Sequence, residues 1–275
     1  MRLATLFSAP MKRWIRNTLG IWPALEMRNR IVMAPYVPRW VRFENAEVER
    51  LGLLLGTVPT AKIACIIPTY KRPEGLISAI NSILAQECRD FVIVVIDDGA
   101  GLPALPHDPR LFAVSLSRNC GIAGLVRNVG IRLSRSEFIA FLDDDNVWTP
   151  DHLAVSVQAL EQGADLIYTA VRRRRPDGSE LDILSRPFNR RQFSDESSFV
   201  DTNAIVLRRS VNPFFSCIPR PRTMFPREDW EFVWRISAHA RVKHVPVATV
   251  DYLVNPESYF TSWPDTKPDE FAGTD

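Results

Sequence analysis

The sequence lacks several features that would assign it to a special class of protein. No uninterrupted apolar run approaches the roughly 20 residues that a membrane-spanning helix needs. The four cysteines show no C-x-x-C spacing and lie mostly in or beside apolar runs, so we expect reduced, buried thiols in a cytosolic protein. The formal net charge is only +2, and we therefore expect no nucleic-acid partner.

The first residues also differ from a secretory signal peptide. The apolar stretch after Arg2 is short, Pro10 interrupts it, and Lys12 and Arg13 follow at once. The chain has 275 residues, of which 46% are hydrophobic. That length and composition suffice for one large domain, or for one domain with an appendage. The sequence contains no internal repeat and indicates no oligomeric state.

Residues 1–60 form a basic amphipathic arm in our interpretation. Up to Arg42 the chain holds eight basic residues against the single acid Glu26. Apolar residues recur at helical spacing over 11–22, and we expect Pro23 to end that helix. Such a helix can lie in the anionic interface of the cytoplasmic membrane, or it can pack on the main domain or a second subunit. Both alternatives stay open.

From Lys62 onward, strongly apolar segments alternate with amphipathic ones. KIACIIPTY and FVIVVIDDGAG are typical of buried strands, and PEGLISAINSILAQ places its apolar residues on one helical face. The alternation continues through a strand at 112–116, a helix at 123–133, a strand at 138–142 and a helix opened by Thr149-Pro150. This pattern predicts an α/β fold, Rossmann-like, with a mostly parallel sheet and helices on both faces.

Beyond residue 165 the pattern changes. DLIYTAV, FVDTNAIVLRRS and VKHVPVATVDYLV predict strands, RRRRPDGSELD predicts a charged hairpin tip, and REDWEFVWRISAHA predicts a helix. The arginines at 172–175 indicate either a solvated face or a contact with an anionic acceptor. We assign residues 61–255 to one domain and expect the polar tail at 256–275 to be loosely ordered.

Polar clusters follow three of the predicted strands at their carboxyl ends, where ligands collect in open α/β sheets. The clusters are Pro68-Thr69-Tyr70, Asp97-Asp98-Gly99 and Asp143-Asp144-Asp145. For Asp97 and Asp98, a tight turn with Gly99 at positive φ competes with hydrogen bonds to a ribose or a base.

The three consecutive aspartates suit a metal site. In an extended segment Asp143 and Asp145 point the same way while Asp144 faces elsewhere. Two such carboxylates suit Mn²⁺ or Mg²⁺, with phosphate oxygens and water completing the shell. The alternative is a solvated turn that the dipole of the following helix favours. In the metal reading, we expect the cation rather than protein groups to neutralise the aspartates.

Several of these segments resemble, in order and spacing, the motifs of family 2 glycosyltransferases. The resemblance covers about residues 62–250 and lies in IIPTYKRPEGLISAINSILAQ, VIVVIDDGAG, LSRNCGIAGLVRNVGIRLSRSEFIAFLDDDNVW and REDWEFVWRIS. It implies the GT-A fold and an inverting, metal-dependent enzyme of cell-envelope polysaccharide biosynthesis. Such an enzyme moves a sugar from a nucleotide-diphosphate donor to a hydroxyl of a glycan or lipid-linked acceptor.

The resemblance also implies a role for each matched position. The nucleotide would bind against Pro68, Thr69, Tyr70, Asp97, Asp98, Arg127 and Asn128. Asp143 and Asp145 resemble the DxD motif that holds the metal, and Asp229 resembles the catalytic base of the family's Glu-Asp pair. The acceptor or sugar pocket would include Asp144, Asp201, Asn203, Glu228 and Trp230.

Elementary chemistry agrees with these roles, because an acceptor hydroxyl is a poor nucleophile until a carboxylate takes its proton.

The chain departs from the family pattern at Arg227, where relatives often carry glycine, and at Asn255, where many carry histidine. A non-catalytic relative that binds sugar nucleotide or glycan therefore stays an alternative. A nucleotidyltransferase is a weaker one, because PTYKRPEG is a poor match to a Gly-rich phosphate loop.

Overall fold

The computed structural model describes residues 20–56, 58–195, 199–221 and 223–254. Its helices are α2 (Ile21–Met33), α3 (Val37–Leu55), α4 (Pro73–Leu84), α5 (Ala123–Leu133), α6 (His152–Glu161), α7 (Arg190–Asp195) and α8 (Glu228–Ile236). Its strands are β1 (Ile63–Thr69), β2 (Phe91–Asp97), β3 (Leu111–Ser115), β4 (Phe138–Phe141), β5 (Asn146–Trp148), β6 (Leu166–Arg174), β7 (Glu180–Leu184), β8 (Ile205–Arg208) and β9 (Val242–Leu253). Short 3-10 turns lie at η2 (Ala34–Tyr36), η3 (Thr202–Ala204) and η4 (Arg209–Val211).

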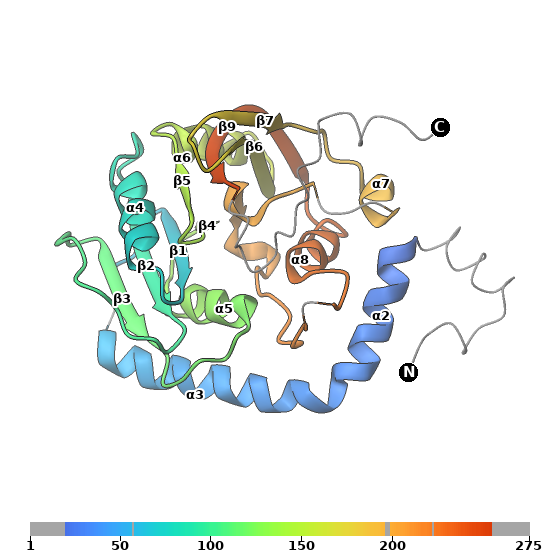
Figure 1. Cartoon of the computed structure of the whole chain (residues 1–275), viewed down its shortest axis with the longest axis horizontal. Helices are drawn as coiled ribbons and strands as arrows, with labels where there is room; N and C mark the ends of the chain where they lie inside the picture. The colour runs from blue at the N-terminus through green and yellow to red at the C-terminus, as the bar shows by residue number, and fades with distance from the viewer. Residues whose placement is uncertain (1–19, 57, 196–198, 222, 255–275) are drawn as a thin grey trace, which may run out of the picture.

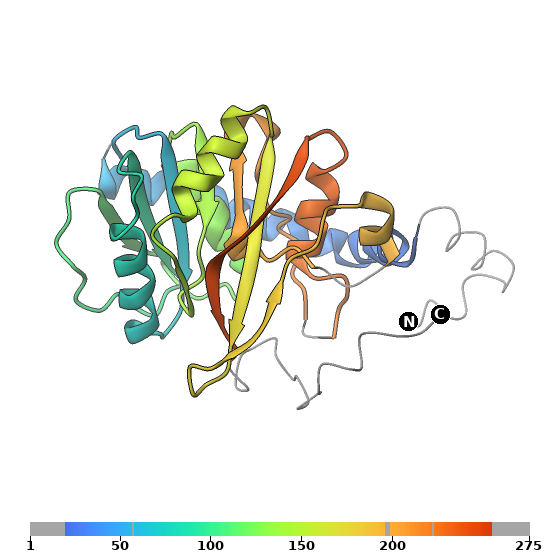
Figure 2. The same ribbon diagram turned by 90° about the horizontal axis from the view of Figure 1, so that it is seen from above.

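All nine strands join one sheet, in the order β3-β2-β1-β4-β8-β6-β9-β5, with β7 paired to β6 (Figures 1 and 2). The pairings β1–β2, β2–β3, β1–β4 and β6–β9 are parallel. β8 is antiparallel to β4 and β6, β5 to β9, and β7 to β6. Six strands therefore run in one direction, which confirms the predicted mostly parallel sheet.

The central strands are apolar because helices cover both of their faces. Every residue of β1 and β2 is buried. α5 packs on β1 and β2 from one side and α4 packs on β1 from the other, while α6 packs on β6, β8 and β9. In β1 and β2, Thr69 pairs with Asp97 at the last position of each strand. The polar clusters that follow these strands therefore lie at one edge of the sheet.

Residues 20–55, which we call the strap, run along the outside of the domain as α2 and α3 (Figure 1). α3 packs on α5 and β3, and α2 packs on α7. Pro23 does not end a helix as predicted but lies in the first turn of α2, where its missing N–H has no helical partner to lose. The predicted helical residues 11–19 lie outside the described ranges.

Two other expectations can be compared with the structure. All four cysteines are free thiols, with Cys65 and Cys120 buried. The arginines at 172–175 are paired rather than simply solvated, because Arg172 and Arg174 contact Asp251, and Arg173 contacts Asp182. Within the described ranges, no helix has both the length and the apolar composition needed to cross a membrane.

Candidate functional site

The three aspartates lie between β4 and β5, and each has different partners. Asp144 and Asp145 occupy a turn, so the extended geometry that we assumed for them is wrong. Asp143 Oδ1 accepts from Arg127 Nη2 at 2.5 Å. Asp144 accepts from Thr69 Oγ1 at 2.7 Å and from the Tyr70 backbone N–H at 3.3 Å. Asp145 Oδ1 accepts from Asn146 Nδ2 at 2.8 Å.

Protein cations neutralise this cluster, contrary to our expectation. Arg72 donates through Nη1 to both Asp144, at 3.3 Å, and Asp145. Arg127 pairs with the remaining carboxylate, that of Asp143. The tertiary fold brings these arginines to the aspartates. Arg72 comes from the loop after β1 and Arg127 from α5, and the sheet places both at the same edge.

The carboxylates still interact with one another. Burial raises the pKa of Asp145, and the nearby charge of Asp143 raises it further, while Arg72 opposes the change. Burial likewise raises the pKa of Asp144 to about 6, against the hydrogen bond from Thr69 and the charge of Arg72. The charges of Asp143 and Asp145 therefore act on each other.

Arg127 joins this cluster to the start of α8. Its side chain is 6% exposed, and its Nη1 donates to Glu228 Oε1 at 3.0 Å. Its guanidinium lies 5.2 Å from the ring centroid of Phe215. Burial alone lowers the pKa of Arg127, but the charges of Asp143 and Glu228 raise it above its usual value. A permanently charged group thus bridges carboxylates from β4 and α8.

Glu228 and Asp229 open α8, with Arg227 as the N-cap residue. Asp229 Oδ1 accepts from the Trp230 backbone N–H at 2.7 Å. Burial raises the pKa of Asp229, while the Trp230 N–H and the charges of Arg127 and Arg227 oppose it. Burial also raises the pKa of Glu228, and Arg127 opposes that shift. A carboxylate with a raised pKa is a better proton acceptor than an exposed one.

A glycine permits the close approach of α5 to α8. A Cβ at Gly124 would lie 2.8 Å from Phe215 Cβ and 3.3 Å from Glu228 Oε2. Any larger residue would push Glu228 away from Arg127.

Asp201 and Asn203 lie beside Asp143. Asn203 Oδ1 accepts from the Asp143 backbone N–H at 2.6 Å, and Asn203 Nδ2 donates to Asp201 Oδ1 at 2.7 Å. Burial raises the pKa of Asp201 to about 6, and the charges of Asp143 and Asp229 add to the effect. The structure therefore brings Asp143, Asp201 and Asp229, from three separate segments, into one electrostatic neighbourhood.

A pocket of about 330 Å³ opens next to the aspartate turn, at the carboxyl ends of β1 and β2. Its lining residues are Thr69, Lys71, Arg72, Pro73, Leu76, Asp97, Ala100, Gly101, Leu102 and Pro103. Asp97 Oδ2 accepts from the backbone N–H groups of Ala100, at 2.9 Å, and Gly101, at 2.7 Å, so it also shapes the turn. The turn role that the sequence left open for Asp97 is thus confirmed, and a hydrogen bond from this pocket residue to a ribose or a base stays a prediction.

Asp98 organises the neighbouring segment instead of lining this pocket. Its Oδ1 accepts from the Cys120 N–H at 2.7 Å, and its Oδ2 accepts from the Gly121 N–H at 2.9 Å and from Asn119 Nδ2 at 3.0 Å. A Cβ at Gly99 would lie 2.3 Å from the Arg118 carbonyl carbon, and the φ of Gly99 is +76°. Only glycine therefore fits this contact.

Three other predicted site residues lie elsewhere. Neither Pro68, which is buried within β1, nor Tyr70, which is 41% exposed, belongs to the pocket lining. Asn128 is buried and bonded on both sides, donating to Glu44 Oε2 at 2.9 Å and accepting from the Phe215 N–H at 2.7 Å. Asn128 is thus a structural link between α5, α3 and the loop before α8, and the nucleotide-binding role that the resemblance implied for it stays a prediction.

Trp230 is also a core residue rather than a pocket residue. It is 2% exposed, stacks on Phe193 at 5.6 Å between ring centroids, and donates from Nε1 to the Phe193 carbonyl at 2.7 Å. The rings of Trp22 and Trp234 also pack against the Trp230 ring.

Sequence reasoning missed three residues at the site. Lys71 and Arg72 line the pocket, and the signal for them was the pair of basic residues directly after the first strand in PTYKRPEG. Tyr252, at the end of β9, pairs with Asn146 of β5. Burial raises the pKa of the Tyr252 phenol, and the charges of Asp201, Asp145 and Asp143 raise it further, so the ring lies near the acidic cluster. Asn255 lies outside the described residues.

The residues present fit a divalent cation only in part. Within the described ranges, no group of three or more His, Cys, Asp or Glu side chains is arranged to hold a metal ion. Asp143 and Asp145 supply two carboxylates whose mutual repulsion a cation would relieve. Mg²⁺ and similar ions bind through one or two carboxylates together with water and substrate phosphates. The donor set therefore fits an ion that arrives with a phosphorylated ligand.

Comparisons with known proteins bear on this geometry. The family model for glycosyl transferase family 2 matches residues 64–215, more than half of the chain. The succinoglycan biosynthesis protein ExoW of Rhizobium meliloti is 34% identical over 121 residues, which are 40% of this chain and 38% of ExoW. The chain thus matches well under half the length of that relative.

Two solved structures share the fold. One is S. aureus TarS 1-349 in complex with UDP-GlcNAc, with a TM-score of 0.56 and 18% identity over 74% of this chain and 61% of that one. The other is the mannosyltransferase PcManGT from Pyrobaculum calidifontis in complex with GDP-Man and Mn²⁺, with a TM-score of 0.54 and 16% identity over 86% of this chain and 68% of that one. At such identities the likeness shows the fold alone. Together with the family match, it shows that the chain belongs to glycosyl transferase family 2 and has the GT-A fold.

Proposed function

We propose that this chain is an inverting, metal-dependent glycosyltransferase that moves a sugar from a nucleotide-diphosphate donor to a hydroxyl of a glycan or lipid-linked acceptor. One observation supports this most. Arg127 pairs with Asp143 of the aspartate cluster and with Glu228 of the Glu-Asp pair, so the two motifs lie on either side of one guanidinium. A donor bound at the first motif would present its sugar toward the second.

The donor would occupy the pocket between the ends of β1 and β2. Thr69 and Asp97 offer hydrogen-bonding groups there, and Lys71 and Arg72 supply positive charge for a diphosphate. Asp143 and Asp145 would hold Mn²⁺ or Mg²⁺, which when bound supplies Lewis-acid stabilisation of the leaving diphosphate. Arg72 now contacts Asp144 and Asp145, and it can turn toward phosphate oxygens once a cation takes over that role.

Asp229 is our candidate for the general base. Its raised pKa suits proton removal from an acceptor hydroxyl, and the charges of Arg127 and Arg227 favour its ionised form. A single base facing the donor sugar gives direct displacement with inversion. Asp201 and Asn203 extend from the metal side toward this base and are candidates for acceptor contacts.

The relatives suggest a setting for this reaction. ExoW is named for succinoglycan biosynthesis, and the TarS and PcManGT structures contain UDP-GlcNAc and GDP-Man. We therefore infer a role in polysaccharide assembly on the cytoplasmic side of the cell envelope.

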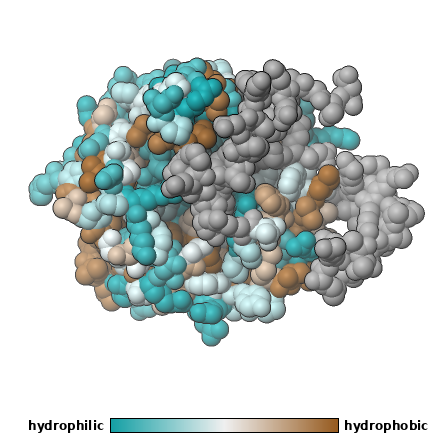
Figure 3. All heavy atoms as spheres, viewed as in Figure 1, coloured by the Kyte–Doolittle hydropathy of each residue, from teal (hydrophilic) through white to brown (hydrophobic). Residues whose placement is uncertain are grey.

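The strap offers a surface for membrane contact. Met27, Ile31, Val32 and Tyr36 are between 51% and 70% exposed on its outer side, and hydrophobic residues appear where α2 runs in Figure 3. The acids Glu26, Glu44 and Glu47 are buried, so the exposed arginines of α3, Arg39, Arg42 and Arg50, outnumber its exposed acid, Glu49. We infer a peripheral contact with anionic lipid.

Liposome co-sedimentation tests the membrane contact. Vesicles with and without phosphatidylglycerol are compared for the wild type and for Ile31→Glu/Val32→Glu, which leaves the buried acids in place. Loss of binding to the anionic vesicles alone supports the contact. Equal binding by wild type and variant would show that this face is not the lipid-binding one.

A donor screen tests the enzymatic proposal. Nucleotide sugars that include UDP-GlcNAc and GDP-Man are incubated with and without Mn²⁺, and binding and release of nucleoside diphosphate are measured. We expect Asp145→Asn to abolish the response to Mn²⁺, and Asp229→Asn to keep donor binding while turnover falls about 10²–10⁴-fold. Asp108→Asn, in a surface pair with Arg110, is the control and should behave as wild type.

The alternatives give different outcomes in the same screen. Donor binding without turnover in the wild type would favour a non-catalytic relative, in which Arg227 has replaced the usual glycine. Release of pyrophosphate from a nucleoside triphosphate and a sugar phosphate would favour a nucleotidyltransferase. An Asp145 variant that keeps its full metal response would remove Asp145 from the metal site.

A further inference from the structure

A buried ion pair joins α2 to the segment that leads into α8. Glu26 is 3% exposed and accepts from both terminal nitrogens of Arg220, at 2.7 and 2.9 Å, while Arg220 is itself 5% exposed. Arg220 Nη1 also donates to the Pro226 carbonyl at 2.9 Å, and Asn29 Nδ2 donates to the Phe225 carbonyl at 2.9 Å. Two hydrogen bonds thus hold the backbone just before Glu228, one from Asn29 and one from the Arg220 that pairs with Glu26.

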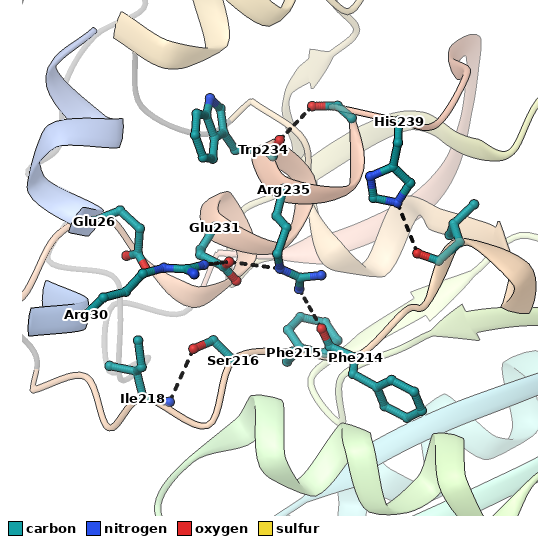
Figure 4. A network of polar contacts seen from close by, with 12 residues as sticks. Glu26, Arg30, Phe214, Phe215, Ser216, Ile218, Glu231, Trp234, Arg235 and His239 are labelled. Carbon is teal, nitrogen blue, oxygen red and sulfur yellow. Dashed lines mark hydrogen bonds and ion pairs between the residues drawn. The ribbon is translucent and has the colours of Figure 1, made fainter. Parts of the chain in front are cut away.

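A second set of contacts reaches α8 itself. Arg30 Nη2 donates to Glu231 Oε1 at 2.6 Å, and the same oxygen accepts from Arg235 Nε at 2.9 Å. Glu231 is fully buried. Figure 4 shows Glu26 and Arg30 of α2 facing Glu231 and Arg235 of α8. Arg30 of the strap is therefore one of the groups that hold α8, together with the contacts that Trp230 and Arg235 make within the domain.

The network continues to the candidate site. Arg235 Nη2 donates to the Phe214 carbonyl at 2.5 Å, and the next residue, Phe215, stacks on Phe232 with ring centroids 4.0 Å apart. Phe215 is also the ring over which Arg127 lies. A continuous set of contacts thus runs from Glu26 to the guanidinium that bridges Asp143 and Glu228.

Buried ion pairs are a poor way to gain stability, because apolar residues of the same size often serve as well or better. Their geometric demands are strict, however, since each charge needs its partner in place. The network residues 26–30 and 220–235 lie outside the 64–215 stretch that the family model matches, whereas its far end at Phe214, Phe215 and Arg127 lies inside it. The strap therefore adds its own constraint to the part of the chain that carries the Glu-Asp pair.

We propose that α2 is a positioning element for the Glu228–Asp229 pair, with Glu26 and Arg30 as its positioning residues. This inference rests on the proposed role of Asp229. It assigns to the strap a function in turnover rather than in donor binding, because the pocket at the ends of β1 and β2 has no lining residue from α2.

Hydrogen–deuterium exchange tests the positioning without any substrate. In Glu26→Gln, which keeps the size of the side chain, the amides of residues 228–236 should exchange at least about tenfold faster, while β1 and β2 exchange as before. Arg30→Gln, at a half-exposed position, is a milder second variant that should act in the same direction. Arg241→Gln, which breaks the exposed bidentate pair with Asp165, is the control. Unchanged exchange in α8 of both strap variants would overturn the proposal.

Kinetics then separates positioning from general stability. With UDP-GlcNAc or GDP-Man as the donor, whichever the wild type turns over, kcat of both strap variants should fall about tenfold while donor KM stays within about twofold. Arg30→Lys, which can still reach Glu231, should recover part of the rate. A rise in donor KM at constant kcat would overturn the proposal. Failure of the wild type to turn over any donor would instead refute the proposed function, and the exchange result would still stand.

Discussion

Two arginines contact the same run of three aspartates, one at the donor side of the site and the other at its α8 side, and their surroundings differ. Arg72 is 36% exposed, follows β1, and pairs with the adjacent residues Asp144 and Asp145. Arg127 is 6% exposed, lies on α5, and pairs with Asp143 and with Glu228 from a distant part of the chain.

The difference in exposure indicates different functions for Arg72 and Arg127. Arg72 is partly exposed to water, and in our proposal it exchanges an aspartate for a phosphate. Arg127 has no such exchange, because removing it leaves two carboxylates facing each other in a poorly hydrated space. The donor side is thus suited to change on ligand binding, whereas the α8 side is suited to hold its geometry.

The largest expected effect comes from removing each arginine in turn. Arg127→Met should lower the free energy of unfolding by about 3 kcal/mol, because Asp143 and Glu228 lose their shared cation. Arg72→Met should lower it by no more than about 1 kcal/mol but weaken donor binding. Urea denaturation and donor titration measure both. If both variants lost the same free energy of unfolding, the two arginines would not differ in their contribution to stability.

A glycine tests the donor side by geometry alone. A Cβ at Gly75, in the first turn of α4, would lie 2.1 Å from the Asp144 carbonyl oxygen. Gly75→Ala should therefore displace the aspartate turn, lower stability by about 2 kcal/mol and weaken donor binding. Gly52→Ala in α3 is the matched control, because its Cβ would meet only Leu133 Cδ2 at 3.8 Å. If Gly75→Ala leaves the hydrogen exchange of the α8 amides unchanged, the donor side can change without changing the α8 side.

The smallest expected effect is a pH dependence on the α8 side. The folded protein keeps a proton on Asp201 up to about pH 6, whereas the unfolded chain loses it near the ordinary value of 3.8. Stability from this group is therefore greatest at low pH and falls as the pH rises from about 4 to about 6. Asp144 acts in the same direction. Asp201→Asn, which can still accept from Asn203, should reduce the slope and gain about 1 kcal/mol at pH 7 relative to wild type.

Denaturation at pH 4.5 and pH 7 measures this slope. The charges that face Asp201 are those of Asp143 and Asp229, so the variant should also respond less to Mn²⁺. A variant with the wild-type slope would show that Asp201 is hydrated in the folded protein.

The donor side could be predicted largely from the sequence, for a physical reason. β1 and β2 are buried on both faces, so their apolar runs are visible in any window of the chain, and parallel strands place their carboxyl ends together. Thr69, Asp97 and Asp144 therefore lie where the strand pattern predicted polar residues to converge. The buried surroundings of Pro68, Asn128 and Trp230 could not be predicted, because a position in a motif does not reveal which way a side chain points.

The strap shows the opposite situation. Glu26, Glu44 and Glu47 point inward while Ile31 and Val32 point outward, which is the reverse of ordinary amphipathic patterning. Hydropathy along the sequence cannot reveal such an arrangement, because the partners of these acids, among them Arg220, Asn128 and Ser117, lie about 70 to 195 residues away.

The three aspartates show which features the sequence determined and which the tertiary structure decided. Their sequence determined that negative charge would gather at the end of β4, since consecutive aspartates after a buried strand can lie nowhere else than at the edge of the sheet. Only the tertiary structure decided how that charge is balanced. Arg72 comes from the loop after β1 and Arg127 from α5, and no local pattern relates either residue to position 143 or 145. Packing of the sheet against α5 brings them together, because a buried carboxylate must find a cation from whatever segment the fold places beside it.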